Sequence, residues 1–113
     1  MKPVAMEQAK HLEGSMEEVF HRLYDIWYEE TGHHSSTDII FSNWAFRRIV
    51  EMGWPVVPLI LEELKREPGL LSWALAEITG EHPVPEEAYG KIGEIAQIWV
   101  EWGEKKGYLS KSD

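Results

Sequence analysis

The stretch that decides the fold is MGWPVVPLILEELKREPGLLSWALAEITG, which runs from Met52 to Gly80. Its apolar residues recur at spacings of three and four, the pattern of helices with one buried face. Pro55 suits a helix start, because the N–H that proline lacks would be unpaired there anyway. Pro68-Gly69 interrupts the pattern, and Gly80 ends it. We therefore expect two helices joined by a turn too short for anything but an antiparallel hairpin.

The pattern also predicts which side chains of the first hairpin helix are buried. The inward-facing residues are Val56, Val57, Ile60, Leu61 and Leu64. Charged residues occupy the other positions and are expected to face water: Glu62, Glu63, Lys65, Arg66 and Glu67.

Further helices are expected on both sides of this hairpin. Ser15 to Glu18 has the form of a capping box, which opens a helix ending near Thr31. A second helix is expected from about Asn43 to Met52, and a third from Pro85 to about Trp102. Gly90 and Gly93 lie three apart on the last one, where small residues would allow another helix to approach closely. Between the first two, residues 39–41 either begin a helix capped from residue 36 or 38, or lie extended.

No segment shows the alternation of a strand, so the predicted fold is all-α, a compact bundle of about five helices around the hairpin. One helical domain is expected over residues 15–108, because a chain of 113 residues suits one core. Residues 1–14 are expected to be a mobile N-terminal arm and residues 109–113 a tail.

Charge and composition exclude several functions. The chain has 11 basic and 20 acidic residues, a formal net charge of −9 and no cysteine. Its basic residues cluster in nothing larger than adjacent pairs such as Arg47-Arg48 and Lys105-Lys106, so direct binding to nucleic acid or to an anionic membrane is disfavoured. The sequence shows neither a signal peptide nor a membrane span, and a cytoplasmic location is expected. An acidic surface keeps a protein soluble and can steer a basic partner protein towards it.

Two resemblances add to this interpretation. The hairpin resembles one unit of a HEAT-type repeat through Met52-Gly53, Val57-Pro58, Leu59 to Leu64, Trp73-Ala74-Leu75 and Ile78-Thr79-Gly80. Since a solenoid needs about three stacked repeats, this implies HEAT-like packing within a small domain.

From Trp27 to Tyr108 the chain also resembles a family of small uncharacterised bacterial proteins. The shared landmarks are Trp27, Glu30-Thr31, Ser35-Ser36, Ala45, Met52-Gly53, Val57-Pro58, Glu63-Leu64, Pro68, Trp73-Ala74-Leu75, Ile78-Thr79-Gly80, Pro83-Val84-Pro85, Trp99, Trp102-Gly103 and Gly107-Tyr108.

This second resemblance implies a bacterial or phage-like origin and no particular activity. In the family, the positions of His33 and His34 are usually apolar, which argues against a family-wide role for these histidines.

Catalytic chemistry finds little support in the sequence. The alternative function is a small metal-dependent enzyme that uses His21, His33 and His34. Zinc catalysis needs three fixed protein ligands, however, and no spaced motif fixes these three. The paired glutamates lie where solvated acids are expected, and there is no phosphate-binding loop or dinucleotide fingerprint. We therefore expect no cofactor and no enzyme activity.

The aromatic content has two interpretations, core packing and an interaction surface. Together with Tyr89 and Tyr108, five of the six tryptophans exceed what a core of this size needs: Trp44, Trp54, Trp73, Trp99 and Trp102. Rings at helical spacing usually face the core, and this interpretation is favoured for all of these residues except Trp54. Tryptophan and tyrosine are also frequent anchors of interfaces. Trp54 is the strongest candidate, because it precedes a proline at an exposed helix start; Trp44 and Tyr89 are further candidates. The predicted function is thus a non-catalytic protein-interaction module, accessory, regulatory or antitoxin-like, that acts at the rim near Trp54 and the turn at Pro68-Gly69. Self-association of the chain is a further expectation compatible with this surface.

Overall fold

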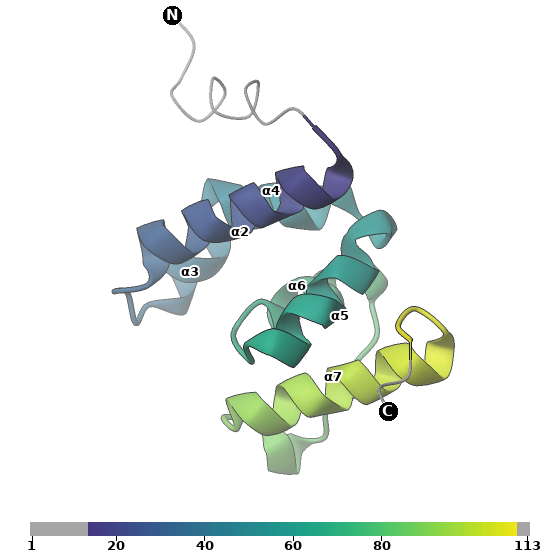
Figure 1. Cartoon of the computed structure of the whole chain (residues 1–113). Coiled ribbons are helices and arrows are strands. Elements are labelled where there is room, and N and C mark those ends of the chain that lie inside the picture. The colour runs from purple at the N-terminus through teal and green to yellow at the C-terminus, as the bar shows by residue number, and fades with distance from the viewer. Residues whose placement is uncertain (1–13, 111–113) are drawn as a thin grey trace, which may run out of the picture. The chain divides into compact units, whose positions relative to one another are not determined.

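The computed structural model describes residues 14–110, and this part of the chain contains helices and no strand. The all-α fold predicted from the sequence is confirmed. Contacts along the chain group it into two compact units, Met1–Met52 and Gly53–Asp113 (Figure 1). Within residues 14–110, no helix combines the length and the apolar character that a membrane crossing requires.

The predicted boundaries, one domain over residues 15–108 with an arm before it and a tail after it, remain predictions. The predicted arm lies outside the described residues except for Gly14, which is exposed. Of the predicted tail, Leu109 is buried, Ser110 is exposed and residues 111–113 lie outside the described part.

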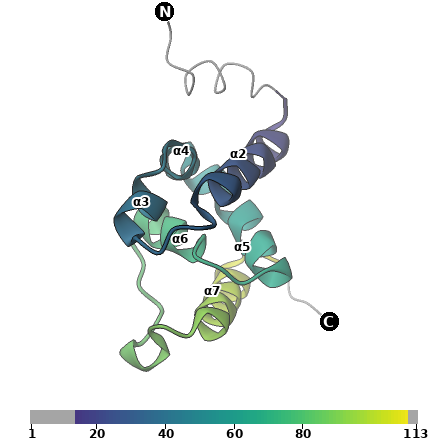
Figure 2. The ribbon, with the colours of Figure 1, turned by 90° about the vertical axis from the view of Figure 1, so that its left-hand side faces the viewer.

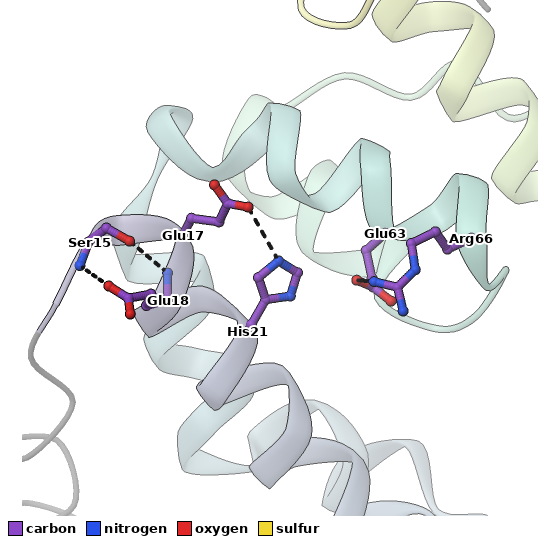
Figure 3. Close-up of polar contacts among 6 residues, drawn as sticks. All are labelled: Ser15, Glu17, Glu18, His21, Glu63 and Arg66. Atoms are coloured by element: carbon purple, nitrogen blue, oxygen red, sulfur yellow. Dashed lines mark hydrogen bonds and ion pairs between the residues drawn. The ribbon is translucent and has the colours of Figure 1, made fainter.

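The first unit contains α2 (Met16–Thr31), α3 (Thr37–Ser42) and α4 (Trp44–Met52), each in contact with the other two. The capping box that opens α2 is present (Figure 3): the Glu18 N–H donates to Ser15 Oγ over 3.1 Å, and the Ser15 N–H donates to Glu18 Oε1 over 2.9 Å. Ser36 caps α3, which decides the alternative left open at residues 39–41 in favour of a helix.

Trp27 ties the helices of the first unit together. Its indole N–H donates to the Ile40 carbonyl over 2.9 Å, and its ring centroid lies 5.3 Å from that of Phe46. The buried apolar side chains of this unit are Phe20, Leu23, Trp27, Ile40, Ala45, Phe46 and Ile49.

The second unit is organised around α5 (Val57–Arg66), which contacts the short helix η1 (Trp54–Val56), α6 (Ser72–Thr79) and α7 (Ile92–Lys106). Gly53 separates the units in sequence with a φ of 75°, a conformation that glycine adopts without strain. All five residues predicted to face inward on the first hairpin helix are buried. On α7, Gly103 lies so close to α5 that an added Cβ would clash with the Leu61 side chain.

Three details of the second unit differ from the sequence prediction. Glu63 is buried, not exposed, because it lies next to the apolar face of α5; its carboxylate accepts a hydrogen bond from Arg66 Nη1 over 3.2 Å (Figure 3). The last helix begins at Ile92, not at Pro85, because Gly90 takes a φ of 86° that no α-helix contains. Gly90 and Gly93 have no atoms within 4 Å of an added Cβ, so the close helix approach predicted there occurs at Gly103 instead.

Candidate functional site

The second unit contains a groove among the described residues. It encloses about 410 Å³, within the range of about 300–1,000 Å³ typical of ligand sites, and its surface is mainly apolar. It lies between α6, the connector that follows α6, and the first turns of α7. Figure 2 shows this connector leaving α6, forming the short helix η2 (Glu86–Ala88) and returning to α7. The lining residues are Ser72, Trp73, Ala76, Glu81, His82, Pro83, Val84, Tyr89, Gly90, Ile95 and Trp99.

Three aromatic rings from three different elements line this groove. Trp99, on α7, is buried, whereas Trp73 on α6 is 41% exposed and Tyr89 on the connector is 66% exposed. Tyrosine and tryptophan offer a large apolar face at a small cost in side-chain entropy, and both are enriched among interface anchors. Trp73 and Tyr89 therefore offer the groove's accessible aromatic surface.

Local backbone chemistry explains why Tyr89 is presented outward. Ala88 is buried and fixes η2, and the Tyr89 N–H donates to the Glu86 carbonyl over 3.0 Å. The Lys91 N–H donates to the Ala88 carbonyl over 3.0 Å, closing a turn through Gly90. Both turns are made by backbone groups, so the Tyr89 side chain is not needed to hold the connector.

The chain segment that supplies most of the groove's lining is acidic. From Glu67 to Gly90 the chain carries five glutamates, all exposed, and no lysine or arginine. One of them, Glu81, lines the groove beside His82. The next cation along the chain is Lys91, whose Nζ lies 3.6 Å from a Glu94 carboxylate oxygen.

The backbone adds to this negative potential. α6 ends at Thr79, with Gly80 as its C-cap directly before Glu81, and a helix C-terminus carries partial negative charge from its unpaired carbonyl groups. The groove thus combines aromatic faces with an environment that favours a cation.

A row of aromatic rings connects the groove to Trp54. The centroids of Trp99 and Trp102 lie 5.1 Å apart, those of Trp102 and Tyr108 5.5 Å, and those of Tyr108 and Trp54 5.5 Å. Trp54 is 46% exposed and Tyr108 is 37% exposed, so the row ends in an accessible pair. The Trp102 indole N–H is buried and has no acceptor among the described residues.

The three residues predicted to bind a partner lie at separate places. Only Tyr89 lines the groove. Trp54 belongs to the exposed pair with Tyr108. Trp44 is half-buried, and its indole N–H donates to Glu30 Oε1 over 3.1 Å, which links α4 to α2. This hydrogen bond gives Trp44 a structural role within the first unit.

The histidines of the metal alternative are not brought into a ligand cluster. Within residues 14–110, no three histidine, aspartate or glutamate side chains are placed to hold a metal ion. His21 lies one turn from Glu17, with 4.0 Å between Nε2 and the carboxylate (Figure 3), and His33 and His34 are exposed.

The sequence prediction missed most of the groove. Trp73 and Trp99 were expected in the core, and Glu81 and His82 carried no prediction. The available signal was the connector itself: two prolines, Pro83 and Pro85, between acidic residues and a tyrosine. A connector of this kind holds a side chain outside the helices that flank it.

Comparison of the chain with models of known protein families, with curated proteins and with solved structures gave no match. The resemblance to a family of small bacterial proteins and the HEAT-like character of the hairpin therefore stay predictions.

Proposed function

We propose that this protein is a non-catalytic interaction module whose groove between α6 and α7 binds a basic segment of a partner protein. The observation that carries the proposal is the groove itself, a mainly apolar hollow with two accessible aromatic rings in a stretch that has only acidic charges. Apolar side chains of a ligand would pack on the apolar lining of the groove, and Glu81 with the other glutamates of this stretch would attract its cations.

The alternative function is a small metal-dependent enzyme that uses His21, His33 and His34. Catalysis by the metal alternative requires three ligands at one place, and the described residues offer no such set. An accessory or antitoxin-like role beside the partner rests on the small size and acidity of the chain.

Selection from a random peptide library tests the proposal. We expect enriched peptides to carry lysine or arginine next to apolar residues, and to bind more weakly as salt rises because exposed charges are screened. Tyr89→Ala should raise the dissociation constant about five-fold or more, as loss of an interface anchor does. Tyr28→Ala is the matched control, since Tyr28 is an exposed tyrosine, 56% accessible, on α2 outside the groove.

Two results would contradict the proposal: enrichment of acidic or uncharged peptides, or equal affinity for the wild type and Tyr89→Ala. Trp54→Ala locates the contact further. If it weakens binding as much as Tyr89→Ala does, the partner also covers the Trp54–Tyr108 pair.

A further inference from the structure

If the function proposed above holds, the residues that line the groove indicate which chemical group of the partner it binds. We infer that the groove holds the guanidinium group of an arginine side chain of the partner, stacked on the accessible aromatic rings and paired with Glu81.

The aromatic faces are the first reason. Cations bind over the faces of tryptophan and tyrosine, and arginine does so more often than lysine. Its guanidinium group is planar and weakly hydrated, so it loses less on leaving water for an aromatic surface than a compact ammonium group does. Trp73 and Tyr89 are the accessible aromatic residues of the lining, and they come from two different elements.

The charges around the groove are the second reason. Glu81 is the only carboxylate among the residues that line the groove, and no lysine or arginine lines it. A carboxylate can accept two parallel N–H bonds from one guanidinium group, which an ammonium group cannot offer in that geometry. The C-terminus of α6, one residue before Glu81, adds partial negative charge at the same end of the groove.

The size of the groove is the third reason. With about 410 Å³ it is larger than one arginine side chain. The part of the lining that the arginine would not cover is mainly apolar and includes Pro83, Val84 and Ile95. This part suits an apolar residue next to the arginine in the partner's sequence. The ligand is thus a short segment with an arginine beside an apolar residue.

Titration of the whole protein with small probes, followed by the NMR signals of backbone amides and indole N–H groups, tests the inference. The probes are the N-acetyl methylamides of arginine, lysine and trimethyl-lysine. We expect the arginine probe to shift the signals of Trp73, Trp99, Glu81 and His82, with an affinity about two- to five-fold above that of the lysine probe. A cation–π contact at a partly exposed site supplies a ratio of this size.

Two pairs of variants separate this contact from general attraction by an acidic surface. Glu81→Gln should reduce the affinity for the arginine probe several-fold, whereas Glu87→Gln should leave it unchanged, since Glu87 is an exposed glutamate of the same stretch that does not line the groove. Tyr89→Ala should weaken binding and Tyr89→Phe should retain it, because the ring and not the hydroxyl carries the contact. Circular dichroism of each variant shows whether its helices are intact.

Each remaining outcome overturns the inference in a defined way. Equal or tighter binding of the lysine probe removes the preference for guanidinium, and tighter binding of trimethyl-lysine assigns the groove to a quaternary ammonium group. If peptides from the library bind in the groove without an arginine, the inference fails and the proposed function stands. If neither a basic peptide nor a probe binds there, both fail.

Discussion

Asn43 performs two tasks at the residue scale. Its Oδ1 accepts hydrogen bonds from the N–H groups of Ala45 and Phe46 over 2.9 and 3.4 Å, capping the start of α4. Its Nδ2 donates to Glu30 Oε1 over 2.9 Å, the same oxygen that accepts from Trp44. One side chain thus caps one helix and fastens it to another.

Asn43→Ala should therefore lower the free energy of unfolding by about 1–2 kcal/mol, the usual cost of a lost cap. Chemical denaturation followed by circular dichroism measures it. Asn43→Ser restores a cap acceptor and should recover part of the loss. Gln97→Ala is the control, because Gln97 is an exposed amide whose side-chain hydrogen bond to Glu101, 3.0 Å long, joins residues of the same helix. A loss for Gln97→Ala as large as that for Asn43→Ala would contradict this role of Asn43.

Glu18 gives a prediction that depends on pH. Its hydrogen bond from the Ser15 N–H, and then that from the Ser15 hydroxyl, lower the pKa of this carboxyl below the ordinary range of a glutamate. A depressed folded-state pKa stabilises the fold above the unfolded value, near 4.3, and this contribution is lost as the pH falls through the folded pKa. We expect NMR titration of the Glu18 carboxyl to show the low pKa, and Ser15→Ala to raise it part of the way. An unshifted pKa in the wild type would contradict the capping box in solution.

At the scale of elements, Gly103 sets how closely α7 approaches α5. Gly103→Ala would force its Cβ into the Leu61 side chain and should cost about 1–3 kcal/mol of stability, as overpacking does. Gly93→Ala, on the same helix, meets no atom within 4 Å and should be neutral or stabilise the protein by up to about 1 kcal/mol. Thermal denaturation of the two variants measures the contrast. A similar melting temperature for both would mean that α7 does not pack closely on α5.

Elements whose signals are local were predictable from the sequence. The capping box at Ser15, the buried face of α5 and the glycine that ends α6 depend on residues within a few positions of each other. The groove depends on Trp73, Tyr89 and Trp99, which only the path of the connector brings together. The burial of Glu63 was missed for a related reason: helical periodicity gives the direction of a side chain, and what covers that side chain is set by the rest of the fold.

At the scale of the whole molecule, net charge and the exposed aromatic pair act in opposite directions. A formal charge of −9 makes copies of the chain repel each other at pH 7, while Trp54 and Tyr108 offer apolar surface for association. The net charge falls towards zero as the pH approaches the isoelectric point near 5.0, so the repulsion weakens. We expect the molar mass from light scattering to rise between pH 7 and pH 5.5, and less so for Trp54→Ala than for the wild type. Added salt at pH 7 should act in the same direction, because it screens the same charges.

Tyr28→Ala, which removes an exposed ring elsewhere, serves as the control. If the wild type and Trp54→Ala associate equally, the Trp54–Tyr108 pair has no part in contacts between copies.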